Sequence, residues 1–129
     1  MDSKINSYFE HMHELCSTQS QALNPFPFNR AQMAAYQDWV NCTNNASNYY
    51  ECDDLPWADE ISDYAQILRN AGIHEIAITD RSSNLMKGLH AFKQCGYDVV
   101  SLCEVTHNEK RWNGIQMTTI PGILLRSTE

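Results

Sequence analysis

The chain has 129 residues, of which 43% are hydrophobic and 10% aromatic, and its formal net charge is -7 at pH 7. This length and aromatic content are typical of one folded domain spanning residues 1–129, and they exclude a disordered chain, which cannot offset its ordering entropy. The acidic balance excludes direct nucleic-acid binding, because affinity for phosphates comes mostly from Lys and Arg, and it favours a basic protein surface as partner.

Membrane and secreted classes are also disfavoured. No stretch approaches the ~20 apolar residues that cross a bilayer, and the start of the chain lacks a basic region followed by an apolar run. The five cysteines are odd in number and without CxxC spacing, which argues against a disulfide framework and a zinc ribbon. We therefore expect a soluble, cytoplasmic protein without cofactor.

Residues 1–50 are predicted to be a helical part that ends in a polar loop. An apolar stripe at spacings of three and four predicts a first helix from Asp2 or Ser3 to Gln21, and "NPFPFNR" then forms an extended connector. A second helix starts with Asn29 as its N-cap. The stretch "NCTNNASNYYECDD" is rich in Asn and Ser and predicts a mobile loop that exposes Cys42 and Cys52.

Residues 51–129 are predicted to form the α/β core, beginning with a helix. Asp53 or Asp54 is the expected cap, Pro56 lies in the first turn, and Gly72 ends the helix. The face predicted to be buried consists of Trp57, Ile61, Tyr64, Ala65 and Leu68.

The rest of the core is predicted as strand, helix, strand, strand. Alternation over residues 75–79 predicts a strand, and a helix over 82–95 follows, with Leu85, Met86 and Phe92 inward and Gly96 as its end. In "YDVVSLCEVTH", apolar residues occur at both the odd-numbered and the even-numbered positions, as in a strand that is covered on both faces. A polar turn, "NEKRWNG", makes a hairpin with a last strand in which Pro121 suits an edge or a bulge.

These elements predict an α+β fold. The two strands on either side of the 82–95 helix should form a parallel pair, and the last strand should run antiparallel to its neighbour. The architecture is therefore a three- or four-stranded mixed sheet packed by helices.

The most informative charge feature runs from residue 51 to 63 and contains six acids without a Lys or Arg. One or two acids are enough to complement a helix N-terminus, so the run is either a solvated helix start or a surface that docks a basic partner. The partner-binding residues in the second interpretation are Tyr49, Tyr50, Glu51, Asp53, Asp54, Asp59, Glu60 and Asp63. Trp112 in "KRWNG" either anchors an interface or folds back over the sheet.

An anion site is the alternative. Asp80, Arg81, Ser82 and Ser83 lie at the C-terminal end of the 75–79 strand, where a helix N-terminus offers free amides. The stretch lacks the glycines of a phosphate loop, however, and Ser82 or Ser83 serves equally well as an N-cap.

Catalytic and metal sites are not indicated. No GxSxG elbow surrounds the serines, and His11 and His13, two residues apart on a helix, point away from each other and cannot chelate one ion. We expect no catalytic residue and no metal.

The stretch "ITDRSSNLMKGLHAFKQCGYDVVSLCEV", a later Trp and "IPGILL" resemble a group of small acidic α+β proteins from gut Firmicutes and their mobile elements. The similarity covers roughly residues 56–126. It implies the same fold and no mechanism, because the group has no known activity. Small acidic proteins of mobile elements include anti-CRISPR proteins, which occupy basic nucleic-acid channels.

The leading hypothesis is thus a non-enzymatic protein-binding module, an inhibitor of anti-CRISPR type whose acidic surface mimics nucleic acid. The alternative is a small enzyme or ligand-binding domain with an anion pocket at the junction of the 75–79 strand and the 82–95 helix. A third hypothesis is a self-associating protein such as a homodimer.

Overall fold

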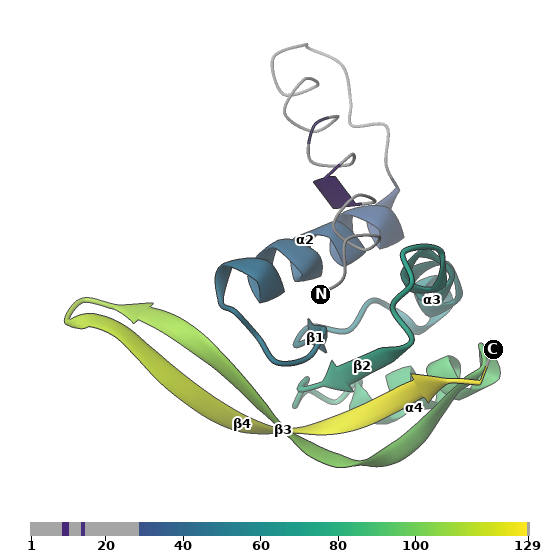
Figure 1. The fold of residues 1–129 in the computed structure, drawn as a ribbon. Helices are drawn as coiled ribbons and strands as arrows, with labels where there is room; N and C mark the ends of the chain where they lie inside the picture. The colour runs from purple at the N-terminus through teal and green to yellow at the C-terminus, as the bar shows by residue number, and fades with distance from the viewer. Residues whose placement is uncertain (1–8, 11–13, 15–28, 129) are drawn as a thin grey trace.

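The computed structural model describes residues 9, 10, 14 and 29–128. They form three α-helices and a four-stranded mixed sheet (Figure 1), which confirms the predicted α+β class. Most of the first predicted helix, the connector after it and the histidines at 11 and 13 lie outside the described residues.

Helix α2 (Arg30–Asn44) begins as predicted. The Asn29 side chain accepts a hydrogen bond from the Gln32 backbone N at 2.9 Å, and the Gln32 side chain accepts one from the Asn29 backbone N at 2.8 Å. This capping box satisfies two amides that the helix leaves unpaired. The buried side of α2, which includes Ala35 and Trp39, packs on α3.

The stretch predicted as a mobile loop contains strand β1 (Glu51–Cys52), which pairs in parallel with β2 (Glu75–Ile78). Tyr50 and Cys52 are buried in the core, and so is Cys42. The prediction that the two cysteines are exposed is therefore wrong. A two-residue strand is too short to show any periodicity, so the sequence could not reveal it.

The third helix starts later than predicted. A short 3-10 turn, η1 (Ala58–Glu60), leads into α3 (Ile61–Asn70), and neither Asp53 nor Asp54 caps it. Trp57 therefore precedes the helix and is exposed instead of buried. The predicted end is confirmed, because Gly72 takes a φ of 82°, which favours glycine.

Helix α4 (Leu85–Gln94) begins after Asn84, so neither Ser82 nor Ser83 occupies the N-cap position. Phe92 faces the core as predicted, whereas Met86 is exposed. Gly96 ends the helix as predicted, with a φ of 91°.

The strand order is β1-β2-β4-β3, so β4 (Gly114–Ser127) lies between β2 and β3 (Tyr97–Arg111). The predicted parallel pair of the strands around α4 is therefore wrong. The antiparallel β3–β4 hairpin is confirmed, but its turn is only Trp112–Asn113.

The hairpin is much longer than the rest of the sheet. Strand β2 pairs with β4 only over residues 123–126, and beyond them the hairpin projects to one side of the molecule (Figure 1). We call residues 104–121 the arm. The prediction that β3 is covered on both faces is wrong, because Val99, Val100 and Leu102 are exposed.

The core lies between the helices and one face of the sheet. Phe92 of α4 packs edge-on against Tyr64 of α3, with ring centroids 6.1 Å apart, and against Tyr97 of β3, at 5.6 Å. Ile76, Ile78 and Leu125 supply the sheet side of the same cluster. These contacts fix the positions of α3 and α4, and the candidate site lies beside the N-terminal end of α4.

Candidate functional site

The acidic run is divided by the fold into exposed and enclosed residues. The exposed acids are Asp53, Asp54, Asp59 and Asp63. Within the described part of the chain, no ion pair involves any of these four. Among the described residues, no Lys, Arg or His neutralises their negative charge by an ion pair.

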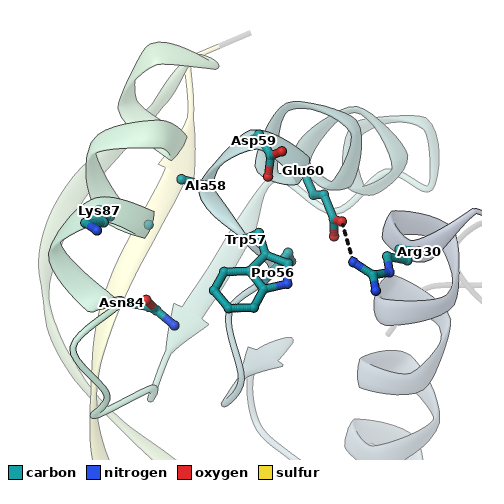
Figure 2. Close-up of a pocket in the computed structure, with 9 residues that line it drawn as sticks. Arg30, Pro56, Trp57, Ala58, Asp59, Glu60, Asn84 and Lys87 are labelled. Atoms are coloured by element: carbon teal, nitrogen blue, oxygen red, sulfur yellow. Dashed lines mark ion pairs between the residues drawn. The ribbon is translucent and has the colours of Figure 1, made fainter.

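An open hollow surrounds Trp57 between the N-terminal ends of α2 and α4 (Figure 2). The volume of this hollow is about 510 Å³. A second hollow of about 340 Å³ adjoins it and extends along α2. Trp57 is 63% exposed. The residues that give the hollow its charge are Arg30, Asp54, Asp59, Glu60 and Lys87. We call this site the Trp57 hollow.

The segment before η1 positions the indole. Leu55 is buried, and its backbone N donates a hydrogen bond to the Asp80 carboxylate at 2.9 Å. Pro56 follows, and the helical turn starts only at Ala58. Because the chain is still extended at Trp57, its side chain projects into the hollow and not onto the buried face of α3.

Two cations complete the hollow and could not be assigned to it from the sequence. Arg30 Nη1 lies 3.5 Å from Glu60 Oε1, so Glu60, which is half-buried, is paired with a cation. Lys87 comes from α4, which is far away in the chain. Of the acids in the hollow, Asp54 and Asp59 are exposed and form no ion pair with any described residue.

Tyr49, Tyr50 and Glu51, the other predicted partner-binding residues, lie away from this surface. Tyr50 is buried, and its hydroxyl donates to the Ala35 carbonyl at 3.0 Å, so its prediction as a surface residue is wrong. Tyr49 is half-buried. Glu51 is also half-buried and accepts a hydrogen bond from Thr79 Oγ1 at 2.7 Å.

A buried acid was missed in the sequence. Asp38 is 7% exposed, and Tyr64 donates its hydroxyl proton to the carboxylate at 2.6 Å. Burial raises the pKa of Asp38 to about 7, and the negative charges of Asp53 and Asp54 add to this effect. The sequence contains one sign of this burial, because Asp38 lies on the side of α2 whose other residues are mostly apolar.

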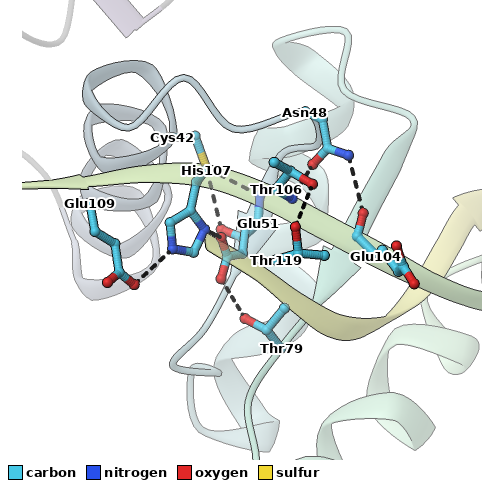
Figure 3. Close-up of polar contacts among 9 residues, drawn as sticks. All are labelled: Cys42, Asn48, Glu51, Thr79, Glu104, Thr106, His107, Glu109 and Thr119. Carbon is cyan, nitrogen blue, oxygen red and sulfur yellow. Dashed lines mark hydrogen bonds and ion pairs between the residues drawn. The ribbon is translucent and has the colours of Figure 1, made fainter. Parts of the chain in front are cut away.

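A small polar pocket of about 220 Å³ lies between α2, β1 and the arm. His107 Nδ1 lies 3.3 Å from Glu51 Oε1, and His107 Nε2 lies 3.2 Å from Glu109 Oε1 (Figure 3). Hydrogen bonds to His107 and, as the second largest contribution, to Arg111 lower the pKa of Glu109. Burial raises the pKa of Cys42 to about 12, so the thiol stays protonated at neutral pH and is a poor nucleophile.

These contacts hold the base of the arm against the body of the domain. The Asn48 backbone N donates to the Thr106 carbonyl at 3.1 Å, and the Asn48 side chain accepts from the Thr106 backbone N at 2.8 Å (Figure 3). Asn108 N donates to the Asn45 carbonyl at 2.7 Å. No group of three or more metal-ligating side chains is arranged around one point among residues 9, 10, 14 and 29–128.

The alternative anion site is only partly assembled. Asp80, Arg81 and several apolar residues line a hollow of about 350 Å³, but Ser82 and Ser83 do not line it and are exposed. The Asp80 carboxylate accepts hydrogen bonds from the backbone N of Ser82 and of Leu55. Burial opposes its ionisation, but these bonds outweigh burial and lower the pKa of Asp80. A carboxylate held in its charged form repels an anion.

Trp112 lies in the turn at the end of the arm and is 98% exposed, so it does not fold back over the sheet. It is not among the residues that line the Trp57 hollow. The two features are separate surfaces.

Residues 33–127 match a family model described as a domain of unknown function, DUF7698. No curated protein matches the chain. In the part that the structure describes, every helix is too short or too polar to span a membrane.

Proposed function

The chain belongs to the DUF7698 family of domains of unknown function, and we propose that it is a non-enzymatic, cytoplasmic protein-binding module that uses the Trp57 hollow to hold a basic surface of its partner. The observation that carries this proposal is the 63% exposed indole of Trp57 beside Asp54 and Asp59, two carboxylates that form no ion pair within the described part of the chain. Trp side chains are enriched at protein interfaces, where the ring packs on the partner and the polar tip stays near water.

The hollow suits an arginine or lysine side chain. A guanidinium stacked on an indole gains about 0.5–2 kcal/mol, and a nearby carboxylate adds a charge-assisted hydrogen bond. The exposed Asp53 and Asp63 extend the negative surface beyond the hollow, which speeds the approach of a basic partner. Arg30 and Lys87 also line the hollow and repel a partner's cations. The partner must therefore place its Arg or Lys side chain beside the acids and away from these two residues.

A basic partner of this kind is a protein that binds nucleic acid. The acidic surface would occupy the site of the phosphates, and the module would then act as an inhibitor of a defence protein in the manner of an anti-CRISPR protein. This finer proposal follows the precedent of other small acidic proteins of mobile elements, which include anti-CRISPR proteins.

A pull-down from a host lysate with quantitative mass spectrometry tests the proposal. The double variant Asp54→Lys/Asp59→Lys should lose the partner that the wild type captures. Glu75→Lys/Asp98→Lys is the matched control, because each replacement adds two charges and both variants change the net charge from -7 to -3. The control breaks only the exposed pairs of Glu75 with Arg126 and Asp98 with Lys93, which contribute little. Equal capture by both variants would refute the role of the hollow.

The second candidate is a ligand-binding domain or small enzyme with an anion site. It is favoured by the hollow of about 350 Å³ that Arg81 lines at the end of β2. Thermal shift with inorganic phosphate separates the two proposals. Stabilisation that disappears in Arg81→Gln would support the anion site, and an unchanged melting temperature would leave only the protein-binding surface.

A further inference from the structure

Along the arm, no described strand covers the outer edge of β4. Strand β2 covers this edge only from Ile123 to Arg126. From Gly114 to Ile120 the residues of β4 pair with β3 on one side, and no described strand pairs with them on the other.

The register identifies which backbone groups point to that edge. The N–H and C=O of Thr106 both bond to Asn48, so they point away from β4. Thr119 is opposite Thr106, and its N–H and C=O therefore point away from β3. Because this direction repeats every second residue, Ile115 and Met117 also present their N–H and C=O groups at the open edge.

The same parity accounts for Pro121. Pro121 is two residues beyond Thr119, so its backbone nitrogen, which carries no hydrogen, faces the outer edge of β4 and not β3. Pro121 costs the hairpin no hydrogen bond, although β4 lies between two strands, and it ends the stretch of β4 that can pair further.

Between the turn and Pro121, the open edge carries no charge that would protect it against pairing. Exposed edges normally carry charges, bulges or prolines, yet residues 112–125 contain no Asp, Glu, Lys or Arg. Ile115 is 70% and Met117 69% exposed. An isolated two-stranded hairpin is marginally stable in water and gains from a third strand.

We propose that this edge of β4 pairs antiparallel with the same edge in a second copy of the chain, in a register centred on Met117. Each Met117 then faces the other, and Ile115 faces Thr119 of the second copy, which uses every outward N–H between the turn and Pro121. About six backbone hydrogen bonds would join the copies, and the pairing is self-complementary, as a two-fold axis requires.

The charge distribution favours a second copy as the occupant. The chain carries a net charge of -7, so two copies repel each other at most of their surface. The uncharged stretch 112–125 is a place where they can meet without opposing like charges. This surface is separate from the Trp57 hollow, so the dimer goes beyond the proposed function and does not depend on it.

Sedimentation velocity of the full chain over a wide concentration range tests the dimer. We expect a reversible monomer–dimer equilibrium, which Met117→Lys weakens roughly tenfold or more because it sets two like charges opposite each other. Gln116→Lys is the matched control. It adds the same charge one residue away, but the side chain lies on the other face of the hairpin, opposite Thr118 of the second copy.

Mixing Met117→Lys with Met117→Glu should restore dimers, because the central pair then has opposite charges. Circular dichroism of each variant confirms that it is folded. If Met117→Lys does not fold, the Met117→Cys variant should form an intermolecular disulfide with diamide, and Gln116→Cys should not exceed the wild type. A wild type that stays monomeric, or equal dimerisation of the Met117 and Gln116 variants, would overturn the proposal.

Discussion

Asp38 is expected to make the stability of the fold depend on pH. Burial raises the pKa of this carboxyl from 3.8 to about 7. Between about pH 4 and pH 7 the folded state therefore keeps a proton that the unfolded state has released, and the free energy of unfolding falls as the pH rises. At about 1.36 kcal/mol for each pH unit, the loss is about 4 kcal/mol once the pH exceeds about 7.

The variant Asp38→Asn removes this dependence. The amide oxygen still accepts the Tyr64 hydroxyl, but the amide group cannot ionise. Its buried NH₂ costs about 1–3 kcal/mol without a partner, so the variant should be less stable than the wild type at about pH 4, where the wild type has lost little, and more stable at about pH 8.

Urea denaturation at the two pH values measures both effects, with exposed Asp63→Asn as the control that should keep the slope of the wild type. The reasoning is wrong if the wild type is equally stable at both pH values, or if Asp38→Asn loses as much stability as the wild type between them.

Three further predictions concern single positions. Asp80→Asn should lower the free energy of unfolding by about 1–3 kcal/mol in urea at neutral pH, because the backbone N of Leu55 and of Ser82 loses a charged acceptor; a change below about 0.5 kcal/mol would contradict this role. Gly88→Ala places a Cβ 2.6 Å from Leu55 Cδ1, so overpacking of about 1–3 kcal/mol should exceed the helix-propensity gain of about 1 kcal/mol. A variant as stable as the wild type would show that Leu55 moves aside freely. Trp112→Ala should leave the melting temperature unchanged, since the side chain is 98% exposed, and a clear decrease would show that the indole packs on the protein.

The parts of the fold that sequence predicted well are those that depend on neighbouring residues. The capping box at Asn29 and the glycines at 72 and 96 mark helix ends through local backbone chemistry. The 75–78 strand and the α4 helix show their own periodicity. Each of these features is complete within about ten residues of chain.

The parts that failed depend on distant partners. The insertion of β4 between β2 and β3 is a choice among strand orders, and no local pattern encodes it. Strand β1 and the burial of Tyr50 follow from pairing with β2 across more than twenty residues. The sequence predicts the exposed apolar residues of β3 to be buried, because apolar character alone does not distinguish a core from an exposed surface.

The residues of the Trp57 hollow show the same division between local and distant information. The acidic run identified Asp54 and Asp59 correctly as surface groups, since no nearby Lys or Arg could pair with them. Trp57 was assigned to a buried helix face, because the late start of η1 could not be foreseen. Arg30 and Lys87 reach the hollow from two other helices, so only the tertiary structure joins them to it.

The affinity of the purified partner for the hollow tests the central claim most directly. Titration calorimetry of that partner should show binding roughly tenfold or more weaker for Trp57→Ala and for Asp54→Lys/Asp59→Lys than for the wild type. The matched Glu75→Lys/Asp98→Lys variant should stay within about twofold of the wild type, because rim and remote charges contribute little. Equal affinities for all four proteins would contradict the account and place the binding surface elsewhere.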